Sequence, residues 1–185
     1  MARAIASFII AALLSSKSFA IIYEFGVQSW NEQSRLHVNS TQYPVNSQSF
    51  GSQIGMTMQY SKKTNIRTKL LLGYGSSHIF QANSGIEFTQ TFLPTVWATI
   101  EPTKIYKLNK ADTEVNFILP IMVRYIGVQK PDPNVTYTDQ FRPLVYAGIE
   151  NRWKLSSNML IVQKFSIPLI AKTGSLWSAG LVVRY

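Results

Sequence analysis

Charged side chains recur at every second position within apolar stretches of this chain, as in Arg67 and Lys69 or Glu150 and Arg152. In a β-strand this spacing places such side chains on one face. Carboxylates and bases on a shared inner face form ion pairs, because an unpaired buried charge is costly. The sequence therefore predicts a network of ion pairs inside the fold. Its six predicted members are Arg67, Lys69, Glu114, Arg124, Glu150 and Arg152. Glu24, Lys164 and Arg184 share the inward phase.

A second candidate for chemistry is the stretch Ser76-Ser77-His78. A serine beside a histidine is a nucleophile and a base for acyl transfer. The simpler alternative, which the sequence favours, is that Ser77, His78 and His37 are surface loop residues. Cysteine is absent, which excludes thiolate chemistry and Cys-based metal sites. We therefore expect no catalytic residues, no metal site and no cofactor.

Eight segments with a two-residue period must position these side chains, and they are rich in strand-forming Tyr, Phe, Thr, Val and Ile. The predicted strands are 23–30, 50–60, 66–76, 88–100, 114–126, 141–153, 159–170 and 176–185. Pro94 and Pro120 fall inside the fourth and fifth strands, where a proline removes a ladder donor. A bulge or a misplaced strand window would account for each.

The connections alternate in length. Residues 61–65 and 154–158 are short, whereas 31–49 and 127–140 are long and polar. Outer-membrane barrels show this alternation, with long loops outside and short turns in the periplasm. The connection 101–112 is too long for a periplasmic turn. We expect the strands to extend there, with the turn near 108–112.

Aromatic residues gather near both ends of the predicted strands, in the outward phase. Transmembrane barrels carry two such girdles at the membrane interfaces, whereas a soluble sandwich would concentrate aromatics in mid-strand. The predicted girdles are Tyr23, Tyr60, Trp153 and Tyr185 at one end and Phe50, Tyr74, Phe88, Tyr125, Phe141 and Trp177 at the other. The pattern favours a transmembrane barrel over a soluble sandwich or a lipocalin-like barrel.

The two ends of the chain agree with this interpretation. Arg3, an apolar run and Ser18-Phe19-Ala20 predict a secretory signal peptide over residues 1–20, followed by a barrel over 21–185. The chain closes on an alternating strand that ends with the aromatic Tyr185.

The stretch 141–158, with a proline, Tyr-Ala-Gly, a basic-aromatic strand end and Lys-Leu-Ser-Ser-Asn, resembles the late hairpin of small outer-membrane proteins of the OmpA/OmpX/OmpW type. The resemblance implies an all-β fold, an eight-stranded antiparallel up-and-down transmembrane β-barrel, in the outer membrane of a Gram-negative bacterium. It also implies outer-membrane lipid, lipopolysaccharide and, through the C-terminal strand, the barrel-assembly machinery as partners.

A fold of this kind does not fix a function. The net charge of +9 is spread singly along the chain, so we expect no nucleic-acid partner. We expect a monomeric barrel with a structural or surface-interaction (adhesin-like) role and a plugged lumen. The alternatives are a narrow, anion-preferring channel and a lipid A-modifying enzyme. Pro143 and Pro168 favour the latter in part, because prolines at those strand ends resemble the lateral gate of lipid A palmitoyltransferases.

Overall fold

The computed structural model describes residues 22–38, 41–61, 64–81, 92–107, 113–127, 135–137, 139–170 and 172–184. The predicted signal peptide lies outside the described residues, as do Phe88 and Tyr185. No helix in the described ranges is long and apolar enough to cross a bilayer.

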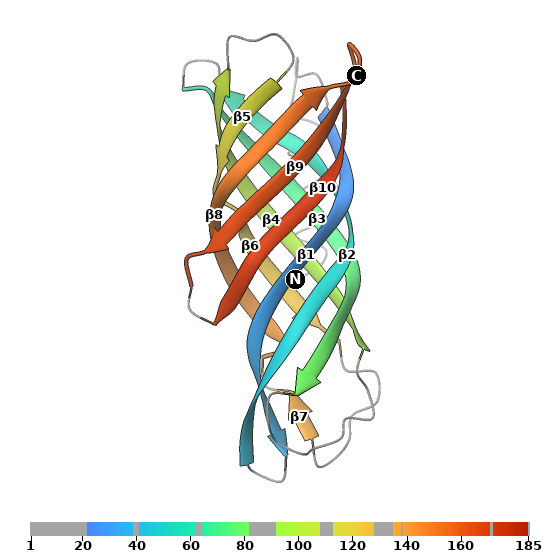
Figure 1. The fold of residues 1–185 in the computed structure, drawn as a ribbon, viewed down its shortest axis with the longest axis vertical. Coiled ribbons are helices and arrows are strands. Elements are labelled where there is room, and N and C mark those ends of the chain that lie inside the picture. The colour runs from blue at the N-terminus through green and yellow to red at the C-terminus, as the bar shows by residue number, and fades with distance from the viewer. Residues whose placement is uncertain are drawn as a thin grey trace, which may run out of the picture.

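One antiparallel sheet closes into a barrel. Its strands are β1 (Ile22–Val38), β2 (Thr41–Ser61), β3 (Ile66–Gln81), β4 (Phe92–Lys107), β5 (Thr113–Ile118), β6 (Ile121–Ile126), β7 (Val135–Tyr137), β8 (Phe141–Lys154), β9 (Met159–Pro168) and β10 (Thr173–Arg184). The ring runs in the order β1, β2, β3, β4, then β5 with β6, then β8, β9 and β10, while β7 pairs with the projecting end of β1. β10 pairs back onto β1, from Ile22 opposite Arg184 to Glu32 opposite Thr173. Because β5 and β6 together fill one place between β4 and β8, the ring has eight strands, as predicted (Figure 1).

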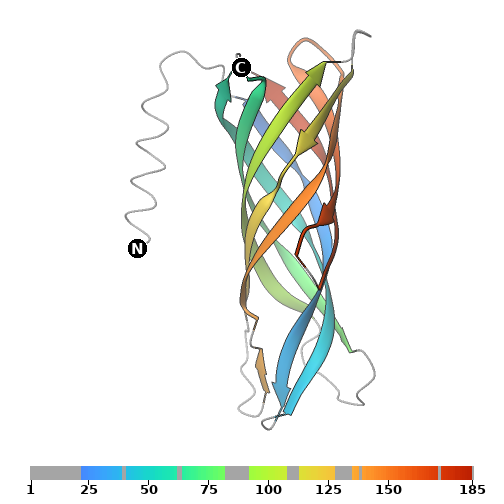
Figure 2. The ribbon, with the colours of Figure 1, turned by 90° about the vertical axis from the view of Figure 1, so that its left-hand side faces the viewer.

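The barrel has two distinct ends. We call one the termini end, because Ile22 and Arg184 pair there. The other is the hairpin end, where β1 and β2 run past the rest of the ring and are joined near residues 39–40. Figure 2 shows these two strands projecting well beyond the end of the ring.

Side chains alternate between a buried inner face and an apolar outer face. Phe165 is 55% exposed and Leu72 46%, although both lie in the middle of strands. An apolar surface of this extent would aggregate in water, but it is what a membrane-spanning barrel presents to lipid. The predicted girdle residues Phe50, Tyr74, Tyr125, Phe141, Trp153 and Trp177 are exposed on this outer surface, and Tyr23 is half-buried.

The prediction of a long loop over 31–49 is wrong. β1 continues to Val38 and β2 begins at Thr41, so this stretch is a projecting hairpin. Its exposed positions carry polar side chains such as Asn31, Gln33 and Gln48. The apolar–polar alternation that marks a membrane strand is therefore lost, although the strand continues. In the predicted loop 127–140, β7 pairs with β1.

The fourth predicted strand is displaced along the chain, because β4 spans Phe92–Lys107 rather than 88–100. The strands do extend into 101–112 as expected, with β5 beginning at Thr113. This displacement explains Pro94, which lies near the start of β4. Its carbonyl accepts a hydrogen bond from Gly127 (2.8 Å), just beyond the end of β6.

Pro120 lies in a two-residue interruption between β5 and β6. The register on both neighbouring strands is unshifted across it, so there is no bulge. Its carbonyl accepts from the Tyr146 N–H (2.9 Å), and the carbonyl of Pro102 accepts from the Leu119 N–H (3.0 Å). Each proline keeps its acceptor bond and lacks only a donor.

The edge of β1 that extends past β10 is covered by side chains and by β7. The Gln33 carbonyl accepts from Arg142 (2.6 Å), and the Arg35 N–H donates to Asp139 (3.0 Å). β7 then pairs with Leu36–Val38. Uncovered strand edges are templates for pairing with another chain, and these contacts remove that opportunity here.

Candidate functional site: the interior of the barrel

The inner face nearer the termini end carries a cluster of buried charges. Glu150 is fully buried at its centre, where its carboxylate accepts from Arg152 Nε (2.7 Å), Arg67 (3.1 Å) and Lys69. Lys69 also contacts Glu24 (3.3 Å) and Glu101. We call this set the charged layer; its members are Glu24, Arg67, Lys69, Glu101, Glu150, Arg152 and Lys164.

Lys164 joins the remaining carboxylates of the charged layer. Its ammonium group contacts Glu101 at 3.1 Å and also contacts Glu24. Asn116 donates to Glu150 at 2.9 Å. All seven charged side chains are at least 95% buried, from five different strands. Buried charges are tolerated only when they are paired and hydrogen-bonded in this way.

The structure brings four of the six predicted network residues together, namely Arg67, Lys69, Glu150 and Arg152. Glu114 lies beside them on β5 and is half-buried. Arg124 is elsewhere. It contacts Glu32 at 2.6 Å, nearer the hairpin end, with Arg142 3.9 Å from the same carboxylate.

Two acidic members of the interior were not among the predicted inward residues. Glu101 lies just beyond the predicted strand 88–100, and it is 2% exposed on β4. Glu32 was assigned to a loop, but it is 3% exposed on β1. The two-residue period contained the signal for Glu101, since Trp97 and Thr99 precede it in the same buried phase.

A second interior layer is aromatic and aliphatic. We call it the aromatic layer; its members are Trp30, Trp97, Met122, Leu144, Tyr146 and Leu176. The indoles of Trp30 and Trp97 meet edge to face, with centroids 5.0 Å apart. The Trp97 indole lies against Gly73 of β3, where a Cβ atom would overlap the ring. A glycine is required at this position because the ring occupies the space of a side chain.

The suggested serine–histidine pair is not assembled. Ser77 is buried on the inner face, where its hydroxyl lies 2.6 Å from both Ser49 Oγ and Thr95 Oγ1. His78 lies on the opposite face of β3 and stacks on Phe92. Within the described ranges, no group of three His, Asp or Glu side chains could hold a metal ion.

A lateral gate for lipid would need loosened pairing between β8 and β9, but the pairing of these two strands is regular. β8 and β9 pair continuously from Tyr146 opposite Pro168 to Lys154 opposite Leu160. Beyond Pro168, the Leu169 N–H still donates to the Val145 carbonyl (2.8 Å). Pro143 lies in the ladder between β6 and β8. The two prolines therefore do not interrupt the β8–β9 seam.

Comparison with known proteins gives similarity of shape alone. No family model matches the chain, and no curated protein matches it. Among solved structures, the barrel is similar to Ail, the attachment invasion locus protein of Yersinia pestis (10% identity, TM-score 0.43, covering 88% of this chain and 99% of that one). It is also similar to Neisserial surface protein A (10% identity, TM-score 0.46, covering 87% and 97%). These values add nothing to what the closed ring already establishes.

The ring of strands and its lipid-compatible exterior define the class. Only helices and closed barrels satisfy every backbone group within a membrane, and a barrel with an apolar outer band is the form used in outer membranes. The chain is a small integral β-barrel of the bacterial outer membrane.

Proposed function

We propose that this barrel acts at the cell surface through its projecting β1–β2 hairpin, while its lumen stays closed to solutes. The observation that carries the proposal is the hairpin itself. β1 and β2 extend past the end of β10 by several residues, and their exposed positions carry polar side chains such as Asn31 and Gln48. A segment of this length and polarity is suited to contacts in water, because lipid would not solvate it.

The edge of the hairpin indicates how such contacts are made. Arg142, Asp139 and β7 already occupy the backbone groups of the β1 edge. Recognition by adding a strand is thereby disfavoured, and recognition by side chains on the hairpin is favoured.

The two interior layers support a closed lumen. An eight-stranded barrel has room for its own side chains and little more. The charged layer with the adjacent Glu114 holds four acidic and four basic side chains in the described ranges. This balance favours a plug over an anion-preferring pore, because an anion path needs an excess of positive charge.

We further propose a non-enzymatic, monomeric protein whose membrane partners are outer-membrane lipid and lipopolysaccharide, assembled by the barrel-assembly machinery. The separation of Ser77 from His78 and the regular β8–β9 seam support a role without lipid chemistry.

Epitope tags test the orientation. A tag between β1 and β2 at Ser40, or before β7 at Asn134, is expected to bind antibody on intact cells. A tag in the β8–β9 turn at Ser157 is the matched control and is expected to be reached only after permeabilisation. The reverse pattern would place the hairpin end in the periplasm and refute a surface role.

Planar bilayer recordings test the plug. The purified protein is expected to show no large, steady conductance. A stable, porin-sized conductance from the unmodified protein would overturn the closed lumen and make the channel the better proposal.

A further inference from the structure

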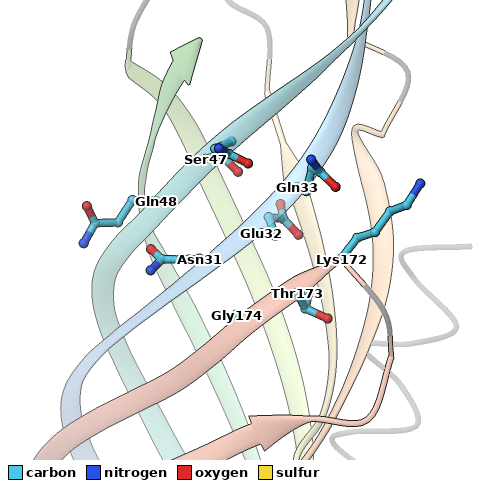
Figure 3. Close-up of a pocket in the computed structure, with 9 residues that line it drawn as sticks. Asn31, Glu32, Gln33, Ser47, Gln48, Lys172, Thr173 and Gly174 are labelled. Atoms are coloured by element: carbon cyan, nitrogen blue, oxygen red, sulfur yellow. The ribbon is translucent and has the colours of Figure 1, made fainter. Parts of the chain in front are cut away.

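At the hairpin end, β1 continues beyond its last pair with β10, which is Glu32 opposite Thr173. Figure 3 shows the start of this open edge, with Gln33 of β1 near Lys172. The Gln33 N–H donates to the Lys172 carbonyl at 2.7 Å. Successive amides of a strand point to opposite edges. The N–H groups of Arg35 and His37 therefore face the same open edge as that of Gln33.

A short segment before β8 covers this edge. We call it the strap; it consists of β7, Asp139 and Gln140. Thr136 of β7 lies opposite His37, and the Asp139 carboxylate accepts from the Arg35 N–H at 3.0 Å. A strand of three paired residues is too short to hold its place by itself, so the strap needs a further attachment.

That attachment comes from inside the barrel. The guanidinium group of Arg124, on β6, donates from Nη1 to the main-chain carbonyls of Asp139 and Gln140, the latter at 2.9 Å. The Ile126 N–H donates to the same Gln140 carbonyl at 2.8 Å. Arg124 is fully buried, so little water competes for these hydrogen bonds.

The other branch of the same guanidinium group contacts β1. Nη2 of Arg124 lies 2.6 Å from Oε1 of Glu32, which is buried and directly precedes Gln33 at the start of the open edge. The guanidinium group thus joins β1, β6 and the strap at one point. It can do so because it presents several donors in a fixed planar fork, whereas a lysine ammonium is a single charged centre.

We propose that Arg124 is a positioning residue for the surface hairpin: from inside the barrel, it holds the strap against the open edge of β1. With the strap in place, the hairpin presents side chains to a partner. With the strap released, the backbone groups of Arg35 and His37 form an edge that accepts a strand from another chain. Arg124 therefore decides which mode of recognition the hairpin uses. The inference deepens the surface role proposed above, and rests on it only for its consequence in cells.

Amide hydrogen exchange of the full barrel in nanodiscs, resolved by NMR, tests the proposal first on the unmodified protein. One opening of the strap would expose the N–H groups of Arg35, His37 and Ile126 together, so we expect their protection factors to agree within about threefold. The Ser34 N–H faces β2 and is expected to be protected about tenfold more strongly. Unrelated protection of the three amides would overturn the proposal.

Arg124→Lys separates the guanidinium fork from its charge. Lysine keeps a positive charge beside Glu32, but one ammonium group cannot also hold both carbonyls of the strap. We expect exchange at Arg35 and His37 to become about tenfold faster, the usual loss for one hydrogen bond. Exchange at Ser34 should be unchanged.

Arg152→Lys is the matched control, because Arg152 is equally buried and contacts Glu150 in the charged layer. It is expected to lower the urea midpoint of the barrel without faster exchange at Arg35 or His37.

A disulfide can replace the attachment that Arg124 provides. His37 and Thr136 are directly opposite, and residues paired in this way have Cα atoms about 4.5–5.5 Å apart, within the range of a disulfide. The chain has no cysteine of its own. In Arg124→Lys protein that also carries His37→Cys and Thr136→Cys, oxidation is expected to restore the protection of Arg35, and reduction to remove it.

Three results with the variants would contradict the positioning role. They are unchanged exchange at Arg35 and His37 in Arg124→Lys, an equal rise at Ser34, and the same rise in Arg152→Lys. All of these measurements use the purified barrel, so they do not depend on which end faces the cell exterior. A failure of the surface role, which the epitope tags report, is thus distinguishable from a failure of this inference.

Discussion

The barrel interior is filled in two different ways along its axis. In the charged layer, side chains of opposite sign hold one another in place, and Glu150 alone contacts Arg67, Lys69 and Arg152. In the aromatic layer, the interior is filled by the packing of apolar side chains, with Trp30 and Trp97 edge to face among them. The first layer depends on the balance of charge, whereas the second depends on volume.

Because of this difference, truncating a side chain destabilises the two layers for different physical reasons. Truncating a packed ring leaves a space, whereas truncating a paired carboxylate leaves uncompensated positive charge that must attract water or move. A closed lumen of this kind can therefore be loosened electrostatically without changing its packing.

The largest expected effect is in the charged layer. Glu150→Ala removes the central carboxylate and leaves its basic partners in excess, so we expect a loss of about 3–5 kcal/mol in unfolding free energy. Urea unfolding in lipid vesicles measures the loss. Glu114→Ala is the matched control, and we expect a smaller effect because Glu114 is only half-buried. Equal effects would mean that the charged layer does not act as a unit.

A charge introduced on the outer surface would have no counter-charges near it, unlike the charges inside the barrel. Leu72, 46% exposed on β3, has lipid rather than counter-charges around it. Leu72→Arg is expected to cost about 2–4 kcal/mol near the middle of the membrane. Leu72→Ala should have little effect, because lipid chains fill the space. A harmless arginine at this position would contradict the lipid-facing assignment.

The aromatic layer is tested by adding volume. Gly73→Ala places a methyl group against the Trp97 indole, and we expect a cost of about 1–3 kcal/mol from overpacking. Gly127→Ala is the control, since its new Cβ atom would come no closer than 3.3 Å to Pro94. Tryptophan fluorescence during unfolding reports both variants. If Gly73→Ala were neutral, the layer would be looser than its packing indicates.

The smallest expected effect concerns neutral hydrogen bonds between the strands. Ser77→Ala removes two contacts of 2.6 Å, to Ser49 and Thr95, and should cost about 1 kcal/mol. Ser52→Ala, on the exposed face of β2, should cost nothing measurable. A loss as large as that of Glu150→Ala would erase the distinction between charged and neutral contacts in the interior.

The sequence predicted the ring of eight strands because lipid imposes a strict alternation wherever a strand crosses it. That alternation placed Phe141, Trp153 and Trp177 in the outward phase, and all three side chains are exposed in the structure. The alternation disappears where a strand leaves the membrane. Asn31 and Gln33 are polar on the outer side of β1, and the sequence therefore could not distinguish a projecting hairpin from a loop.

The interior was harder to predict, because partners there come from strands far apart in the chain. The two-residue period identified Lys69 and Glu150 as inward residues. It could not show that Lys164 contacts Glu101, because the two residues are 63 positions apart in the chain. The aromatic layer was not predicted. In the sequence, Trp97 cannot be told from the other aromatic residues of the strands. In the structure, its ring lies over Gly73 of β3, inside the barrel.

The pairing of Ile22 with Arg184 has a consequence for how the chain could be rearranged. β1 and β10 pair in the ring as any other two neighbouring strands do. The break between them could therefore be closed by a linker, and a new break could be opened at one of the turns. A short linker from Arg184 to Ile22, together with new ends in the β8–β9 turn at Ser157, would give a circular permutant that retains every strand pair. The last strand of that permutant would be β8, which ends at Lys154, instead of β10. Comparing its membrane insertion with that of the parent would separate the role of β10 as the last strand from the stability of the closed ring.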